Sequence, residues 1–402
     1  MVSVDEAEKI ILDSIINTDL VEDISLVNCY NRVLAEDIKA DREQPPFDRV
    51  AMDGIAIPYK LFEKGLRKFR IQKNIQRAGI PSYTLEDNFD CIEVMTGAKM
   101  PNNTDTVIKY EDLIIENNVA YLKGNIKVDY KQNIHFKGSD YSKNQILLQK
   151  GVKIGPIQTS IIASIGKSKV KVFKIPNIAI IATGDELVDI DKEPLDYQIR
   201  MSNAYAIQCG LVNNNFINSQ IFHLNDDKDI LLNKMRDILN NFDFLIMSGG
   251  VSVGKFDFIP EILKTLEVKE FFHKVKQKPG KPLFFGKSKN NVPIFGLPGN
   301  PISTIVCFYR YVIPCLYKIC NKKYFQKYVT IYHDFNLKNQ LTNFLPVKTF
   351  YDDNYNFSAS VIKTNGSGDY YSAFESNGFI EIKENTNFVK AGTILKYFEW
   401  NI

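Results

Sequence analysis

The chain has 402 residues, of which 45% are hydrophobic and 24% are charged. This composition is typical of an ordinary globular protein with about two to four domains. The formal net charge is only +3, so the global charge gives no support for nucleic-acid binding. A membrane-spanning helix needs about 18 apolar residues in a row, and no apolar run in this sequence is that long. Neither nucleic acid nor a membrane is therefore an expected partner.

The cysteines and the N-terminal residues bear on the cellular compartment. The six cysteines form no CxxC pair and the four histidines are scattered, so we expect neither a zinc site nor a disulfide scaffold. Asp5, Glu6 and Glu8 stand where a secretory signal would carry basic residues. A reducing cytoplasm is the simplest setting, and we expect a cytoplasmic protein.

Two helical segments are predicted in the first 170 residues. Ser3 and Glu6 form the pattern of a capping box, which predicts a helix over 4–16. Residues 1–40 are predicted to form one or two helices, and residues 141–170 are predicted to be helical again after a Gly-Pro pair. We expect these two segments to pack together as a helical linker domain.

The region between them is predicted to be β-rich. Prolines make the segment 41–57 extended. Short strand-like runs follow, punctuated by Gly, Pro and Asn. The expected strands are 69–75, 91–95, 106–110, 119–122 and 126–128. Residues 41–140 are thus predicted to form a small β-rich domain that is inserted into the helical linker domain.

From residue 171 to about 325, predicted strands and helices alternate. The expected strands are 177–182, 216–223, 243–248 and 292–296. The expected helices are 202–213, 227–241, 257–267 and 301–320. Such alternation predicts a parallel sheet with helices on both faces, in which ligands bind beyond the carboxyl ends of the strands.

The predicted fold class is therefore multidomain α/β plus β. Its central part is a three-layer α/β domain over 171–325. The segments 1–40 with 141–170 form the helical linker domain, and 41–140 form the inserted β-rich domain. Residues 326–402 contain strand-like runs at 329–334, 357–362, 379–382 and 393–398, which predict a small C-terminal β domain.

A glycine-rich loop follows the third predicted strand of the α/β domain. The apolar run 242–247 ends in Ser248, Gly249 and Gly250, with Gly254 further on. Glycines after a buried strand let backbone N–H groups approach a phosphate. Two similar turns, KPGKP and LPGNP, follow along the chain. Together the three turns suggest a nucleotide or pterin phosphate site.

This loop also matches most of a P-loop pattern. Gly249 to Lys255 satisfies GxxxxGK, but Phe256 stands where a P-loop carries a Ser or Thr hydroxyl for Mg²⁺. Without that hydroxyl the loop offers the metal no ligand. An NTP-hydrolysing P-loop is therefore not expected.

Four carboxylates follow different strands of the predicted sheet. They are Asp185, Glu186, Asp226 and Asp257. Carboxylates that meet beside a phosphate loop suit Mg²⁺, which prefers a few carboxylates together with waters and phosphate oxygens. The alternative is that each one caps a helix. Any one alone favours the cap, whereas the set favours a metal site.

Lysines gather around the KPGKP turn. Lys274, Lys276 and Lys278 alternate with other residues, so an extended backbone would place them on one face, with Lys281 just beyond the turn. Such cations suit phosphate or another oxyanion. The alternative is a solvated edge strand whose lysines block aggregation, and it stays open above all for Lys276.

The LPGNP turn also has two readings. Asn300 is a good N-cap and Pro301 a good first helical residue, which explains the turn without any function. The helix N-terminus, with Ser303 in its first turn, could also offer free N–H groups to an anion. In the β-rich region, the turns 51–54 and 95–98 support no functional interpretation by themselves.

These segments, taken in order, resemble one known family. The segments PPFDRVAMDGIAI, EVMTGAKMPNNTDTVIKYED, FKGSDYS, IATGDEL, SGGVSVGKFDF, KPGKP, FGLPGNP and NGSGDYYSAFESNGF resemble the molybdopterin molybdenumtransferases, a family of the bacterial MoeA proteins and the gephyrin E domain. The resemblance implies that the β-rich domain 41–140 is elongated, and it implies a homodimer with a site shared between subunits. It implies Mg²⁺ as cofactor, and molybdate and adenylylated molybdopterin as substrates, with release of AMP.

The resemblance also implies roles for particular residues. The implied catalytic residues are Asp53, Thr96, Asp140, Glu186, Lys274, Lys278, Pro298 and Pro301. The implied cofactor-binding residues are Gly184, Ser248, Gly249, Gly250, Gly254, Lys281, Gly299, Ser303 and Ser367. The implied metal ligands are Glu186, Asp226 and Asp257.

The sequence departs from the family pattern at two places. Lys255 stands where many relatives have an acidic or small residue, and the stretch 339–346 lacks the arginines that often begin the last domain.

Two other functions stay open: the adenylyltransferase of the preceding step and a gephyrin-like adaptor. The implied protein partners are a molybdopterin adenylyltransferase and apo-molybdoenzymes or their chaperones.

Overall fold

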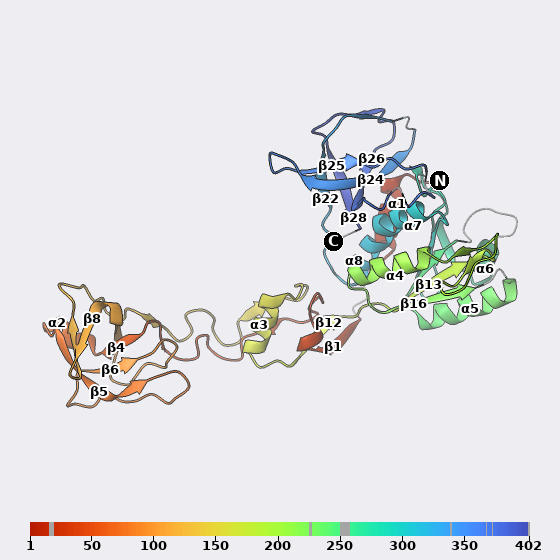
Figure 1. The fold of residues 1–402 in the computed structure, drawn as a ribbon. Helices are drawn as coiled ribbons and strands as arrows, with labels where there is room; N and C mark the ends of the chain where they lie inside the picture. Colours follow the sequence, from red (N-terminus) through yellow and green to blue (C-terminus); the bar gives the residue numbers. More distant parts are fainter. Residues whose placement is uncertain are drawn as a thin grey trace. The chain divides into compact units, whose positions relative to one another are not determined.

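A computed structural model describes residues 1–15, 20–224, 227–249, 258–337, 340–366, 368–371 and 373–400. The chain divides into two compact units (Figure 1). One unit joins Met1–Glu22 with Val172–Ile402, and the other is Asp23–Lys171. The finer division into four domains stays a prediction.

The second unit is built around a six-stranded sheet with the order β7-β4-β6-β5-β9-β8. Its strands are β4 (Gly54–Ile57), β5 (Lys68–Gln76), β6 (Cys91–Val94), β7 (Thr106–Lys109), β8 (Leu113–Glu116) and β9 (Val119–Leu122). Ile55, Phe69 and Ile108 are fully buried in its core. Four of the expected strands are confirmed. The expected strand 126–128 is wrong, because those residues have no strand pairing and Val128 is buried in the same core.

Shorter elements complete this unit. They are β1 (Val21–Ser25), η1 (Leu26–Asn28), β2 (Ile38–Lys39), β3 (Arg49–Val50), α2 (Tyr59–Glu63), η2 (Tyr110–Asp112), β10 (Ile134–His135), β11 (Ile146–Leu148), α3 (Pro156–Ser164) and β12 (Lys169–Phe173). Strand β1 pairs with β12, β2 with β11 and β3 with β10. The helix after Gly155 is confirmed.

The N-terminal segment differs from its prediction. Helix α1 (Val4–Ser14) begins with the expected capping box of Ser3 and Glu6. The prediction of one or two helices over residues 1–40 is wrong beyond α1, because burial in β1 alternates with period two, which is the period of a strand. Helix α1 also packs in the first unit, where Val4, Ala7 and Ile11 join the core of the α/β sheet.

The first unit contains the predicted α/β layers. Its six-stranded sheet has the order β16-β13-β17-β21-β20-β18. The strands are β13 (Ile178–Thr183), β16 (Ser219–Leu224), β17 (Phe244–Ser248), β18 (Lys269–Phe272), β20 (Phe284–Lys287) and β21 (Pro293–Leu297). The four strands expected from the alternation are parallel to one another. Strand β20 pairs antiparallel with β21 on one side and with β18 on the other, and neither β18 nor β20 was predicted.

Helices cover both faces of this sheet. Ile178 and Ile180 of β13 pack with α1, α4 (Asn203–Asn213), α7 (Pro301–Cys307) and α8 (Ile313–Ile319). Ala179 and Ile181 point to the other face and pack with α5 (Lys228–Asn241) and α6 (Ile259–Thr265). Alternate residues of one strand therefore serve two cores, with α4 and α5 on opposite sides of the sheet (Figure 1).

One helical stretch bears on the expectation that the chain has no membrane-spanning helix. Helix α7, the π-helical η3 (Phe308–Val312) and α8 run on from one another as Pro301–Ile319, which is long and apolar enough to cross a membrane by length and composition. Our search for apolar runs missed it because Arg310 and Lys318 interrupt it. The stretch is 83% buried inside the unit, and this core position accounts for its composition.

The C-terminal residues form a small β-barrel. Its strands are β22 (Lys327–Ile331), β24 (Thr342–Tyr351), β25 (Phe357–Val361), β26 (Gly378–Ile382) and β28 (Ile394–Glu399), and β24 closes the barrel by pairing with both β25 and β26. The remaining strands of the unit are β14 (Leu187–Val188), β15 (Ile199–Arg200), β19 (Gln277–Lys278), β23 (Phe335–Asn336) and β27 (Phe388–Val389). The sequence did not predict β24, because Pro346 interrupts its pattern.

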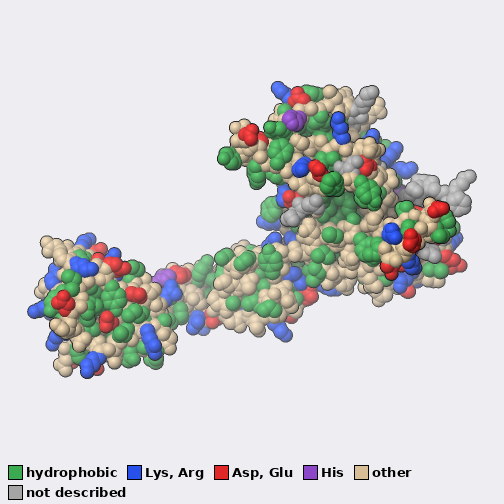
Figure 2. Space-filling view, viewed as in Figure 1, with side chains coloured by type: hydrophobic (Ala, Val, Ile, Leu, Met, Phe, Trp, Pro, Cys, Tyr) green, Lys and Arg blue, Asp and Glu red, His purple; other side chains and the backbone are tan. Residues whose placement is uncertain are grey.

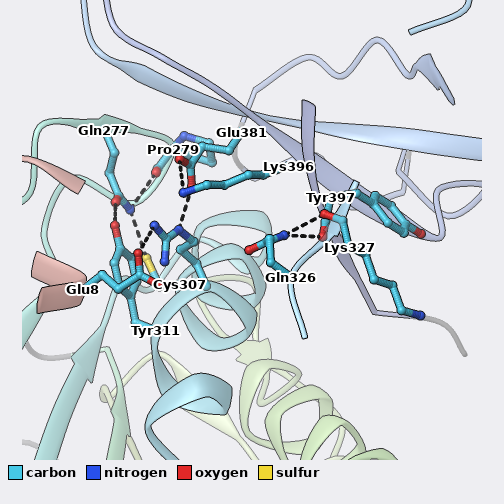
Figure 3. A network of polar contacts seen from close by, with 11 residues as sticks. Glu8, Gln277, Pro279, Cys307, Tyr311, Gln326, Lys327, Glu381, Lys396 and Tyr397 are labelled. Atoms are coloured by element: carbon cyan, nitrogen blue, oxygen red, sulfur yellow. Dashed lines mark hydrogen bonds and ion pairs between the residues drawn. The ribbon is translucent and has the colours of Figure 1, made fainter. Parts of the chain in front are cut away.

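A buried ionic network joins the helices to this barrel (Figure 3). Arg310 of η3 is 1% exposed and donates to Glu381 of β26 at 2.7 Å and to Glu8 of α1 at 2.8 Å. Lys396 of β28 lies 3.5 Å from Glu381. Burial opposes the charge of Arg310, but the charges of Glu381 and Glu8 raise its pKa above the ordinary value. The network therefore connects α1, the helical stretch Pro301–Ile319 (the core helix) and the barrel.

Candidate functional site

Three loops meet at the carboxyl edge of the parallel strands. Ala182 of β13 pairs with Ser248 of β17, and Ser248 pairs with Leu297 of β21. The residues that follow these strands are Gly184, Gly249 and Pro298. The edge of the sheet therefore carries the expected glycine loop and LPGNP turn together, as a ligand site in this class of sheet requires.

The glycines of this edge stand where the chain is crowded. Gly249 has a φ of +91°, and a Cβ there would lie 2.8 Å from the carbonyl oxygen of Thr183. Gly184 has a φ of +140°, and a Cβ there would lie 2.5 Å from Glu186 Oε2. Among the residues that the structure describes, the buried Thr183 hydroxyl beside Gly249 has no hydrogen-bond partner. This polar group lies next to the first glycine of the loop that the sequence analysis interpreted as a phosphate site.

Asn203 links two of the loops. Its Nδ2 donates to Ser248 Oγ at 3.1 Å and to the Gly299 carbonyl oxygen at 2.7 Å. The sequence did not single out this residue. The one signal that could have pointed to it is an amide side chain at the start of the predicted helix 202–213, which follows the predicted strand 177–182. Asn203 therefore fixes the spacing between the glycine loop and the LPGNP turn.

The LPGNP turn is held by a hydroxyl that the sequence also missed. Thr304 Oγ1 donates to the Pro298 carbonyl oxygen at 2.6 Å and lies 3.0 Å from that of Asn300. Asn300 occupies the N-cap position of α7 as expected, without a side-chain cap hydrogen bond. Pro298 and Ser303 are buried, whereas Gly299 is exposed at the start of α7. The helix thus begins at the carboxyl edge of the sheet.

The alternation of the lysine segment is confirmed. Lys274, Lys276 and Lys278 are exposed, whereas Val275 and Gln277 between them are buried. Backbone hydrogen bonds hold the segment from two sides. Val2 bonds the backbone of residues 274 and 276, and β19 pairs with β24 of the barrel in parallel.

Gln277 shapes the KPGKP turn (Figure 3). Its Nε2 donates to the carbonyl oxygens of Pro279 at 3.2 Å and Gly280 at 3.1 Å, and its Oε1 accepts from the Tyr311 hydroxyl at 2.5 Å. Gly280 has a φ of +87°, and a Cβ there would lie 3.6 Å from the carbonyl oxygen of Ser303. The turn that carries Lys278 and the exposed Lys281 therefore lies against the first turn of α7.

The metal set is only partly described. Glu186 is exposed at the end of β13, where the sequence placed it. Among the residues that the structure describes, no group of three His, Cys, Asp or Glu side chains could hold a metal. The other expected ligands and loop residues lie outside the described residues; these are Asp226, Gly250, Gly254, Lys255, Asp257 and Ser367.

In the other unit, the structure pairs two expected residues. Asp53 Oδ1 accepts from the Thr96 backbone N–H at 2.6 Å and from the Thr96 hydroxyl at 2.7 Å. The backbone N–H and then the hydroxyl lower the pKa of Asp53, so its exposed carboxylate stays charged at neutral pH. The turns 51–54 and 95–98, which are uninformative separately, thus form one polar site.

Asp140 belongs to a second cluster in the same unit. Its Oδ1 lies 2.8 Å from His135 Nε2, and Arg49 Nη2 lies 2.9 Å from His135 Nδ1. A guanidinium group only donates, so Nδ1 accepts and Nε2–H donates to Asp140. The sequence analysis missed Arg49 and His135, which β3 and β10 bring together by pairing.

Comparisons with known proteins identify the family of the chain. Residues 2–166 match the model of the MoeA N-terminal region (domain I and II), 179–318 that of a probable molybdopterin binding domain, and 329–400 that of the MoeA C-terminal region (domain IV). A molybdopterin molybdenumtransferase of Synechocystis sp. is 38% identical over 92% of this chain and 93% of its own length. The chain belongs to the molybdopterin molybdenumtransferase family.

Other members of the molybdopterin molybdenumtransferase family match along the whole chain. The enzyme of that name from Haemophilus influenzae is 30% identical over 98% of this chain and 97% of its own length. The crystal structure of a molybdopterin biosynthesis MoeA protein from Pyrococcus horikoshii superposes with a TM-score of 0.82 at 27% identity, with all of both chains covered. The predicted multidomain α/β plus β fold class is thereby confirmed.

Proposed function

We propose that the protein is a molybdopterin molybdenumtransferase that inserts molybdate into adenylylated molybdopterin and releases AMP. The observation that carries this proposal is that the glycine loops and the lysine turn both lie at the start of one helix. Glycine loops linked by Asn203 lie at the start of α7, and the turn with Lys278 and Lys281 lies against its first turn. One set suits a pyrophosphate and the other a tetrahedral oxyanion.

The roles of the residues follow from their chemistry. Backbone N–H groups of the loop that begins at Gly249 hold the pyrophosphate of the substrate. Lys278 and Lys281 attract molybdate and keep it beside the dithiolene sulfurs that receive the metal. Gln277 contributes by fixing the turn that carries both lysines. These residues bind and orient the two substrates, which is the main part of their contribution to the rate.

Magnesium is proposed as the cofactor of this reaction. Glu186 would hold it together with Asp226 and Asp257, which lie outside the described residues. Oxygen ligands of this kind fit Mg²⁺, and the buried Thr183 hydroxyl, which has no partner among the described residues, adds a polar group at the same edge. The bound ion would neutralise charge on the pyrophosphate oxygens. The carboxylates would hold and orient the ion beside the glycine loop.

Two other functions fit the chain less well. An adenylyltransferase of the preceding step resembles only the α/β part, and it leaves the β-rich unit and the C-terminal barrel without a role. An adaptor that binds peptides has no need of a lysine turn that Gln277 and Tyr311 hold beside the carboxyl edge of the sheet.

We propose a cytoplasmic enzyme that receives its pterin from an adenylyltransferase and passes the cofactor to apo-molybdoenzymes or their chaperones.

The test of this function is the release of AMP. Purified protein with Mg²⁺ and adenylylated molybdopterin is expected to release AMP only when molybdate is added. Chromatography of the nucleotide products over time gives the rate. Release at the same rate without molybdate, or none at any molybdate concentration, would overturn the proposal. Sulfate in place of molybdate serves as the oxyanion control and is expected to give no release.

We also propose that the enzyme is a homodimer whose site is shared between subunits. One chain would supply Asp53 and Thr96, and its partner would supply the glycine loops and the lysine turn. This arrangement predicts complementation between dead variants. Asp53→Ala and Asp257→Ala should each be inactive alone, whereas a mixed dimer holds one site with neither defect. AMP release should therefore reappear after subunit exchange, at up to about half of the wild-type rate per mixed dimer.

A matched pair of variants controls this experiment. Asp53→Ala mixed with Thr96→Ala should stay inactive, because both changes lie on the same side of every shared site. Labelled subunits and native mass spectrometry confirm that exchange has occurred. If the mixture of Asp53→Ala and Asp257→Ala stays inactive although the subunits have exchanged, the site is built within one chain.

A further inference from the structure

A buried lysine lies at the edge of the α/β sheet that is opposite to the candidate site. Lys287 ends β20 and pairs with Pro293, which begins β21, so it lies level with the amino ends of the parallel strands. On the face that Figure 2 shows, basic and acidic side chains are interspersed at the surface. Lys287, by contrast, is only 7% exposed and places a positive charge inside the unit.

Lys287 has one hydrogen-bond partner among the residues that the structure describes. Its Nζ donates to the Ser14 carbonyl oxygen at the end of α1 at 2.9 Å, although an ammonium group has three N–H donors. No carboxylate of the described residues forms an ion pair with it. Burial lowers the pKa of Lys287, and the positive charge of Lys269 lowers it as well. Because a buried ammonium group needs an anion or further hydrogen bonds to stay charged, Lys287 favours an anionic ligand beside it.

A pocket of about 310 Å³ adjoins this lysine. Its volume is at the lower end of the range of small-molecule sites, which is about 300–1,000 Å³. The described apolar residues that line the pocket come from the ends of helices and strands and from the segments beside them; they are Ile15, Leu20, Pro176, Val292, Pro293 and Ile319. An organic ligand with an apolar body fits such walls better than a bare inorganic ion does.

The other charged residues that line the pocket are Lys174 and Asp243. Lys174 Nζ lies 3.4 Å from Asp243 Oδ2, and the same oxygen accepts from the backbone N–H of Asn177 at 2.9 Å. These two charges therefore compensate each other. Among the described residues that line the pocket, Lys287 is then the one charged side chain without an ionic partner. A ligand with a single negative charge balances it.

Local hydrogen bonds hold Lys287 beside the pocket. The turn between β20 and β21 is closed by a backbone hydrogen bond from Ser288 to the Val292 carbonyl oxygen at 3.0 Å, and the Val292 N–H donates to Ser288 Oγ at 3.1 Å. Both strands are buried in the sheet. The spacing between Lys287 and the apolar wall of Val292 and Pro293 is therefore fixed, and a ligand need not order these residues when it binds.

The alternative is that Lys287 only caps α1. Cations stabilise the C-terminal end of a helix through its free carbonyl oxygens. Lys318 of α8 already serves this end, because its Nζ donates to the Leu12 carbonyl oxygen from a half-buried position. The contact with Ser14 accounts for one N–H of Lys287, and a capping role does not explain why an enclosed ammonium group adjoins an apolar pocket.

We propose that this pocket binds a small organic monocarboxylate. The carboxylate accepts hydrogen bonds from Lys287, and the apolar body of the ligand lies against Ile15, Val292 and Ile319. The charge of Lys287 selects against neutral compounds, and the apolar walls select against small inorganic anions. This ligand site lies at the amino edge of the sheet, so it is distinct from the candidate site at the carboxyl edge and does not depend on the proposed function.

The first experiment determines the class of ligand in the unmodified full-length protein by isothermal titration calorimetry. Hexanoate is expected to bind at one site per chain. The compound 1-hexanol has the same carbon chain without the charge, and acetate has the charge without the chain, so each should bind at least about tenfold more weakly. Equal binding of hexanoate and either of these compounds, or no binding of hexanoate, would overturn the proposal.

A set of variants locates the site. Lys287→Met removes the ammonium group and keeps a side chain of similar length, so the affinity for hexanoate should fall about tenfold to a hundredfold. Lys289→Met is the matched control, because Lys289 lies on the same turn, is exposed and pairs with Glu267. It should change the affinity less than about twofold. Lys278→Ala, in the lysine turn, should also bind hexanoate as the wild type does. Unchanged binding by Lys287→Met would refute the site.

A crystal structure of the wild-type protein with 4-bromobenzoate tests the site even if Lys287→Met fails to fold. The anomalous signal of the bromine is expected beside Ile319, with the carboxylate within hydrogen-bonding distance of Lys287 Nζ. Bromine signal only at other places, such as the lysine turn, would contradict the proposal. So would a structure in which Lys287 contacts ordered water and no carboxylate at a saturating concentration of the compound.

Discussion

Replacing Arg310 by alanine is expected to lower the free energy of unfolding by about 3–5 kcal/mol. Arg310 is almost fully buried and donates to both Glu381 and Glu8. The truncation leaves the Glu381 carboxylate, which is 4% exposed, without its main partner in a low-dielectric region. Urea unfolding followed by circular dichroism measures the change.

Two further variants sharpen this test. Lys348→Ala removes an exposed pair with Glu375 and should cost less than about 1 kcal/mol. Adding Glu381→Leu to Arg310→Ala should recover part of the lost stability, because the unpaired buried charge is then gone. If Arg310→Ala costs no more than the surface control, the network contributes little to the stability of the unit.

Replacing Lys278 by alanine is expected to raise the molybdate concentration for half-maximal AMP release about tenfold to a hundredfold. The reason is the loss of a charge-assisted hydrogen bond to the oxyanion, worth about 1.5–3 kcal/mol. Excess molybdate should partly restore the rate, because the side chain captures the oxyanion and does not hold the fold. Lys278 is exposed, so the melting temperature should stay unchanged.

Lys276→Ala is the matched control for this variant. Lys276 shares the exposed face of the segment but precedes the turn that Gln277 fixes. It should change the molybdate requirement less than twofold, whereas Lys281→Ala should act in the same direction as Lys278→Ala. Equal and negligible effects of all three variants would mean that the lysines only keep an edge strand solvated.

The sequence was most informative where a local pattern has one structural solution. The capping box of Ser3 and Glu6, the alternating strands and helices of the α/β layers, and the exposed face of Lys274, Lys276 and Lys278 were all read correctly. Each depends on a period or a spacing within about ten residues. Glycines after buried strands likewise pointed to the edge where Gly184 and Gly249 lie.

What the sequence did not reveal depends on contacts between distant segments. Asn203 meets Gly299 across 96 positions, and Arg310 meets Glu8 across 302. Neither pairing leaves a local trace, because an amide at a helix start and an arginine in an apolar run each have simpler explanations. Strand β24 was missed for a related reason. Its pairing on both sides stabilises a proline-containing segment that its own sequence does not favour as a strand.

The parallel pairing of β19 with β24 changes the meaning of the missing arginines at the start of the barrel. Thr342 and Asn343 meet Gln277 and Lys278 through their backbones, whatever side chains they carry. The pairing therefore does not depend on arginine side chains, whereas an inserted or deleted residue before Thr342 would shift β24 by one position along the lysine segment and turn the side chains of β24 to the opposite face. Within the family, the length of the connection into the barrel should vary less than its amino acids.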